Sequence, residues 1–237
     1  MSRITRREMS MWMVALSLPL LQGGCDPFVH SSTIRYRLTV EVATPQGLRI
    51  GSSVIQSTMA MGRTMYGRGI SYNVKGEAVA VALPGGTLFA VLNNSAIGYD
   101  YPTYLLHNAL MHGVAAPPLS RRFEPHEWME ETEEAKRVKP TVVLHSDDYP
   151  TLVRFRDPSE ITSMEVVDPE DLAAAFGPSV YLRRILLQVT DDPVTKTIRN
   201  RMPAMGSKTN FSSWHLGLPR TDIRSNLTGD NFSRNIR

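Results

Sequence analysis

The feature that most restricts the fold of this chain is a run of alternating apolar and polar residues at positions 34–42. The run reads IRYRLTVEV, with every second side chain apolar from Ile34 to Val42. A period of two is typical of a strand that buries one face and leaves the other in solvent. Residues 44–47 (TPQG) have the composition of a turn, and residues 48–56 follow as a second apolar segment. The sequence therefore predicts that the folded part begins with a β-hairpin.

A second hairpin is predicted from residues 72–83 and 87–92, which flank a Pro-Gly-Gly turn. The end of its first strand is apolar on both faces, which is typical of a covered central strand. Residues 58–71 carry three methionines and three glycines. We expect a mobile loop there, whose methionines either pack on the core or form a soft contact surface. The segment Gly51-Ser52-Ser53 predicts a bulge or a close approach of another backbone segment.

Helices and further strands are predicted in the second half of the chain. Helical patterns cover residues 104–112, 126–138, 166–177 and 194–201, and strand patterns cover residues 141–144, 152–155 and 181–190. The third helix has Asp168 as its expected N-cap and Gly177 as its stop. The fold class that follows is α+β: an antiparallel β-sheet built from hairpins and completed by residues 181–190, with a few short helices. A β-sandwich with helical insertions is the alternative.

The first 25 residues indicate where the protein is located. Three arginines, Arg3, Arg6 and Arg7, precede an uncharged and mostly apolar segment at residues 9–21. This segment is shorter than the roughly 20 residues that a membrane-spanning helix needs. A basic start, a short apolar segment and an exit of small residues are typical of a cleaved secretory signal.

The exit, LQGGC, ends at Cys25, the only cysteine of the chain. It resembles a bacterial lipoprotein signal, although a leucine-like residue is usual where Gln22 stands. That resemblance implies that Cys25 is acylated and anchors the protein, and that Asp26 acts as an inner-membrane retention signal. Ordinary secretion, an uncleaved anchor and a cytoplasmic location are the alternatives. Residues 5–9 (TRREM) also loosely resemble a twin-arginine export signal.

The predicted layout has four parts: a signal peptide at residues 1–24, a tether at 25–33, a single α+β domain at 34–205 and a disordered tail at 206–237. The tail is rich in Ser, Asn, Thr and Arg and shows no sustained apolar period. One cysteine excludes an intramolecular disulfide and a cysteine-rich metal site. The domain must therefore depend on its core, which 42% apolar residues can supply.

Composition gives no reason to expect a nucleic-acid partner. The whole chain has a net charge of +3, and the predicted signal peptide carries most of this excess. The mature chain is then close to neutral. No phosphate-binding glycine loop and no G-x-S-x-G motif is present. We therefore expect no cofactor and no resident metal.

The most concentrated group of chemically active side chains is His145, Asp147 and Asp148, which lie between two predicted strands. A histidine and two carboxylates can bind a cation or transfer protons. An ordinary turn before Pro150, with a surface histidine, is the interpretation that we favour.

Two other pairs of side chains were considered as sites. His107 and His112 lie five residues apart, whereas two zinc-binding histidines on one helix face lie four apart. Asp191 and Asp192 precede a proline and are expected to form a turn. These pairs therefore supply no convincing site.

Blocks within residues 34–203 resemble an uncharacterised family of bacterial exported proteins without an established activity. These blocks are YRLTVEVATPQGLRIGSSVI, GEAVAVALPGG followed by TLFA, and EVVDPEDLAAAFG leading to TDDPVT. The resemblance implies an exported bacterial domain and no catalytic residues. The resulting functional hypothesis is a lipid-anchored envelope protein on the periplasmic side that binds or scaffolds, with the membrane and an envelope protein as partners. The alternative is an envelope hydrolase that uses His145, Asp147 and Asp148.

Overall fold

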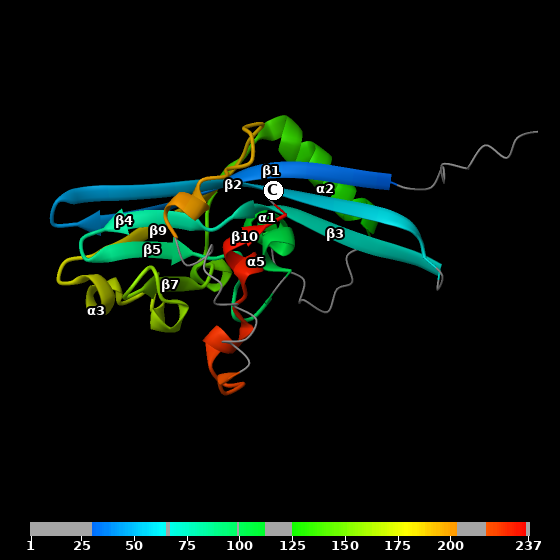
Figure 1. The fold of residues 1–237 in the computed structure, drawn as a ribbon. Helices are drawn as coiled ribbons and strands as arrows, with labels where there is room; N and C mark the ends of the chain where they lie inside the picture. Colours follow the sequence, from blue (N-terminus) through cyan, green and yellow to red (C-terminus); the bar gives the residue numbers. More distant parts are fainter. Residues whose placement is uncertain (1–29, 65–66, 99, 112–124, 203–216, 236–237) are drawn as a thin grey trace, which may run out of the picture.

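The computed structural model describes residues 30–64, 67–98, 100–111, 125–202 and 217–235. The predicted signal peptide, Cys25 and the first part of the predicted tether lie outside these residues. The fold is α+β and contains two antiparallel sheets (Figure 1). The predicted fold class is therefore confirmed.

The larger sheet has six strands in the order β10-β3-β2-β1-β9-β6. Its strands are β1 His30–Thr44, β2 Gly47–Thr64, β3 Gly67–Glu77, β6 Thr141–Val143, β9 Tyr181–Val189 and β10 Ser233–Arg234. The predicted first hairpin is present as β1 and β2, paired without a break from Thr44↔Gly47 to His30↔Met61. β9 completes the sheet beside β1, as predicted.

The first hairpin is longer than its alternating pattern indicated. Residues 30–33, predicted as tether, belong to β1, and most of the predicted mobile loop at residues 58–71 belongs to β2 and β3. The prediction of a loop was wrong because glycines interrupt the alternating pattern of side chains in these two strands. Gly62 pairs with Gly69, and Met59 is only 4% exposed. The methionine-rich segment is thus a strand pair.

The smaller sheet has four strands in the order β4-β5-β7-β8. They are β4 Val79–Leu83, β5 Gly86–Ala90, β7 Leu152–Phe155 and β8 Met164–Val167. The predicted second hairpin is present as β4 and β5, but residues 72–77 belong to β3 in the larger sheet. The chain changes sheets at Ala78, whose N–H donates to the Phe232 carbonyl at 2.9 Å.

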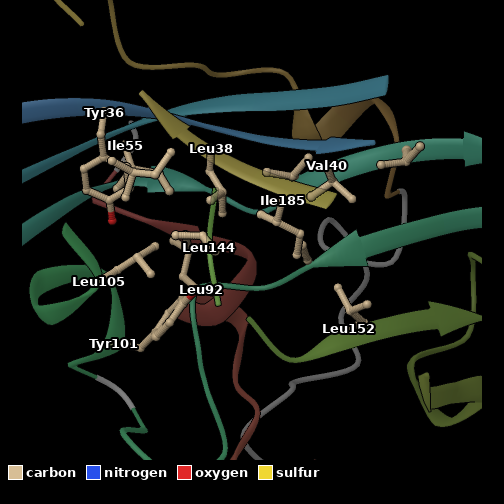
Figure 2. Packing of buried hydrophobic residues seen from close by; sticks show 14 of the residues in the cluster. Tyr36, Leu38, Val40, Ile55, Leu92, Tyr101, Leu105, Leu144, Leu152 and Ile185 are labelled. Carbon is tan, nitrogen blue, oxygen red and sulfur yellow. The ribbon is translucent and has the colours of Figure 1, made fainter. Parts of the chain in front are cut away.

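The main hydrophobic core lies between the two sheets and beneath α1. Figure 2 shows side chains of the larger sheet, among them Leu38, Val40 and Ile185, facing Leu92 and Leu152 across this space. Each of these five residues is at most 1% exposed. Burial of such side chains supplies the main favourable term in folding.

Helices cover the part of the larger sheet that the smaller sheet does not reach. They are α1 Tyr101–Met111 and α2 Pro125–Val138, with the short α3 Leu172–Phe176 and α5 Gly229–Phe232 elsewhere. Four 3-10 turns complete the described elements: η1 Ser146–Asp148, η2 Ile161–Ser163, η3 Ile198–Asn200 and η6 Ile223–Asn226. The predicted helix at 194–201 is therefore only the turn η3.

The predicted helix at residues 166–177 starts later than expected. Val166 and Val167 extend β8, and the Asp168 carboxylate accepts a hydrogen bond from the Glu170 N–H at 2.9 Å, which makes a turn. Asp171 is the N-cap, and its Oδ1 accepts from the Ala174 N–H at 3.1 Å. Pairing of β8 with β7 holds the first residues in the extended conformation.

The prediction of a disordered tail is wrong for residues 217–235. β10 pairs with β3, and Phe232 is completely buried in a second core cluster against Phe89 and Phe155. The apolar residues that anchor this segment are few and widely spaced, so they form no periodic pattern. Residues 206–216 lie outside the described part of the chain.

Candidate functional site

The predicted group of His145, Asp147 and Asp148 is divided between the surface and the interior. His145 precedes η1, and its Nδ1 lies 3.3 Å from Asp147 Oδ2. Both of these side chains are exposed, whereas Asp148 is only 3% exposed. The short 3-10 turn causes the division, because consecutive residues of a tight turn point in different directions. The three groups therefore do not converge on one reacting atom or ion.

Asp148 lies beside a group of buried polar side chains. The Tyr101 hydroxyl donates to the Asp148 carbonyl at 2.8 Å, and the Tyr36 hydroxyl donates to the Pro102 carbonyl at 2.6 Å. Burial raises the pKa of Tyr36 far above its ordinary value, and the charge of Arg234 opposes this rise only in part. Burial also raises the pKa of Tyr101. Both phenols therefore stay protonated and act as hydrogen-bond donors within the core.

His107 lies on α1 and contacts α2. Its Nδ1 is 2.7 Å from Glu131 Oε2, and its side chain is 4% exposed. The ring also packs beside Trp128, with 6.2 Å between the centroids. His112 lies outside the described residues. The contacts of His107 join the two helices.

Asp191 and Asp192 form ion pairs with two different basic side chains. Asp191 pairs with Lys139, and Asp192 pairs with Arg37. Hydrogen bonds from the Thr190 hydroxyl and from Arg37 lower the pKa of Asp192. These aspartates therefore hold the chain after β9 against Lys139 and Arg37.

Arg183 and Arg184 both reach Glu41, although alternation along a strand predicts opposite directions. Arg184 donates two hydrogen bonds to the Glu41 carboxylate at 2.9 and 3.0 Å, and Arg183 lies 3.8 Å away. A register shift between Glu41 and Val42 in the pairing with β9 breaks the alternation. The hydrogen bonds from Arg184 lower the pKa of Glu41.

A cavity that the sequence did not predict lies beside β2 and measures about 220 Å³. Gly51, at its wall, confirms the predicted close approach, because a Cβ at this position would lie 2.4 Å from the Ala80 carbonyl oxygen. The buried Glu77 carboxylate accepts from the Thr197 N–H at 2.8 Å and from the Ile198 N–H at 3.0 Å. Only Gly51 carried a sequence signal, since Glu77 and Thr197 lie far apart in the chain.

Exposed apolar side chains gather where β1 turns into β2. Leu48 is 42% exposed, Ile50 is 59% exposed and Tyr181 is 59% exposed. Leu48 and Tyr181 both pair with Ala43, from opposite sides of β1. These three residues are called the hairpin-end patch below. Apolar groups that cluster on a surface are typical of binding sites.

The described residues contain neither a cluster of metal ligands nor a membrane-spanning helix. No group of three or more His, Cys, Asp and Glu side chains there is placed to hold a metal ion. No helix in the same part of the chain has the length and apolar character required to cross a membrane.

Comparison with known proteins gave no relatives: no family model, no curated protein and no solved structure matches the chain. The resemblance to uncharacterised bacterial exported proteins therefore stays a prediction.

Proposed function

We propose that the protein is a lipid-anchored component of the bacterial cell envelope that binds or scaffolds another envelope protein and does not catalyse a reaction. The support for the anchor comes from the sequence, through the signal segment and Cys25. The support for binding comes from the hairpin-end patch, whose three large side chains are all more than 40% exposed.

The position of this patch is the main support for the proposal. Figure 1 shows the start of β1 and the β1–β2 turn at opposite ends of the molecule. The strand from His30 to Thr44 spans about 45 Å at the usual rise per residue. A chain tethered ahead of His30 would thus present the patch away from the membrane.

The anchor is tested by mass spectrometry of the mature N-terminus after expression in a Gram-negative bacterium. The expected result is an acylated Cys25 in the membrane fraction, and Cys25→Ser should release the protein from that fraction. An intact Met1 in a soluble fraction would refute the envelope location.

Binding at the patch is tested by a photo-crosslinking amino acid at Ile50 in the same cells. Val138 is a suitable control position because it is similarly exposed, at 55%, but lies at the end of α2. We expect a discrete adduct from Ile50 and none from Val138. Equal adducts from both positions would argue against a specific binding face.

A further inference from the structure

The edge of β2 that faces away from β1 is only partly occupied. β1 pairs with β2 from Gly47 to Met61, but β3 pairs with β2 only from Gln56 to Thr64. Across the ranges that the structure describes, no strand is hydrogen-bonded to residues 47–55 on that second side. This stretch is called the open edge of β2. Unpaired strand edges are templates for the addition of another strand.

The backbone groups on the open edge can be identified from Val54. The Val54 N–H donates to Thr195 Oγ1 at 2.8 Å, and the Val54 carbonyl accepts from the Thr195 N–H at 3.2 Å. The Val54 groups therefore point away from β1. Because the direction alternates along an antiparallel strand, the N–H and carbonyl groups of Ile50 and Ser52 point the same way. Together they offer two donors and two acceptors to an added strand.

The cavity of about 220 Å³ runs along these two residues. Its walls come from β2, from the end of β3 and the start of β4, and from the segment around η3. The residues that line it include Ile50, Ser52, Glu77, Ala80, Thr197 and Arg201. The space beside the open edge is therefore not filled by another described segment.

Among the residues that line this cavity, Arg201 is the exposed charged side chain. Arg201 Nη1 donates to the Ala80 carbonyl at 3.1 Å, and Arg201 forms no ion pair with a carboxylate of the described residues. The Glu77 carboxylate is buried and already accepts hydrogen bonds from Thr197 and Ile198. The cavity therefore favours a ligand with a negative side chain.

We propose that the open edge of β2 binds an extended peptide segment of another protein, which adds to the sheet as a strand. Backbone hydrogen bonds to Ile50 and Ser52 provide affinity, as in other strand-addition complexes. Apolar side chains on one face of the peptide pack on Leu48 and Ile50, and an acidic side chain reaches Arg201. A second copy of this chain fits less well, because it would bring the same basic side chain to the same groove.

The inference rests on the proposed function, because it names the class of partner that the binding protein takes. It is tested by selecting random twelve-residue peptides displayed on phage against the purified full-length protein. The affinity of a synthetic peptide with the selected sequence is then measured by fluorescence polarisation. We expect selected peptides to alternate apolar residues and to share an acidic residue.

Two proline variants provide the decisive comparison. Ile50→Pro removes an N–H from the open edge without removing a β1–β2 hydrogen bond, and should weaken peptide binding at least tenfold. Val143→Pro is the matched control. Val143 is 56% exposed on the edge strand β6, and the Leu144 N–H, not that of Val143, donates to β9. This control should leave peptide affinity within twofold. Arg201→Glu should weaken binding of the same peptide and should reverse the protein's preference for peptides with an acidic residue.

Several results would overturn the inference. They are an absence of enriched peptides, equal affinity of wild type and Ile50→Pro, or binding lost equally in both proline variants. A dimer that Ile50→Pro abolishes would make a second copy the occupant. Slower amide exchange of Ile50 and Ser52 with bound peptide is a readout that needs no variant, and unchanged exchange would refute strand addition. Crosslinking from Ile50 in cells without peptide binding would reject this inference and leave the proposed function intact.

Discussion

The two halves of β2 belong to one continuous strand but differ in their surroundings. Residues 56–61 have β1 on one side and β3 on the other, whereas residues 47–55 have a paired strand on one side only. Beyond the last β2–β3 pair, Gln56↔Lys75, β3 continues to Gly76 and Glu77, which pair with β10. The other half lies against the smaller sheet at Gly51 and borders the cavity. A strand can thus be structural along one half and available for binding along the other.

The largest expected effect concerns Phe232, the residue before β10, which pairs with the last two residues of β3. Phe232→Ala should lower the free energy of unfolding by about 3–5 kcal/mol, because it empties a fully buried aromatic site. Ile223→Ala is the control, since Ile223 is 41% exposed in the same segment, and it should cost less than about 1 kcal/mol. Urea denaturation measures both. A similarly small loss for Phe232→Ala would contradict the burial of this ring against Phe89 and Phe155.

The next effect concerns the close approach beneath the open half. Gly51→Ala should destabilise the protein by about 2–3 kcal/mol, because the new Cβ would lie 2.4 Å from a backbone oxygen. The neighbouring Ser52→Ala changes an exposed side chain and should stay within about 0.5 kcal/mol of wild type. Equal thermal stability of the two variants would contradict the close packing of the sheets at this point.

Two buried serines distinguish the halves more finely. The Ser53 hydroxyl, in the open half, is buried without a hydrogen-bond partner among the described residues, whereas Ser32 Oγ, beside the paired half, donates to Glu133 Oε1 at 2.9 Å. Ser53→Ala should therefore raise the free energy of unfolding by up to about 1 kcal/mol, and Ser32→Ala should lower it by about 1 kcal/mol. If chemical denaturation shows a lower free energy of unfolding for Ser53→Ala, the Ser53 hydroxyl has a hydrogen-bond partner outside the described residues.

The smallest effect is a pH dependence at the open half, where Glu41 pairs with Ile50. Hydrogen bonds from Arg184 lower the Glu41 pKa in the folded state. The unfolded state then binds more protons as the pH falls through the ordinary carboxyl range, so this stabilisation is present above that range and is lost toward the lowered pKa. Glu41→Gln and Arg184→Met should both flatten the acid limb of a plot of melting temperature against pH. An unchanged acid limb would contradict the pairing.

The alternation at residues 34–42 was sufficient to predict the first hairpin and the antiparallel sheet. It could not predict strand length, because glycines at residues 62 and 69 carry no side chain to mark a face. It also could not predict the closing strand β10, which is only two residues long. Periodicity tells which face of a strand is buried, but not whether its edges are paired.

The candidate sites were harder to predict for the same reason. Asp148 is adjacent to Asp147 in sequence, yet a single tight turn buries one and exposes the other. Glu77 and Thr197 meet only through the crossing of the chain between distant elements. Gly51 was the one useful signal, since an isolated glycine in a strand often marks a close backbone contact.

Amide hydrogen exchange by NMR in dilute solution tests the difference between the halves most directly. By the alternation from Val54, the N–H groups of Ile50 and Ser52 face the open edge, while those of Thr58 and Ala60 face β3. The expected result is exchange close to the rate of an unfolded chain for Ile50 and Ser52. The amides of Thr58 and Ala60 should exchange at least about a thousandfold more slowly. Equal protection of all four amides would show that another segment covers the edge and would contradict the account.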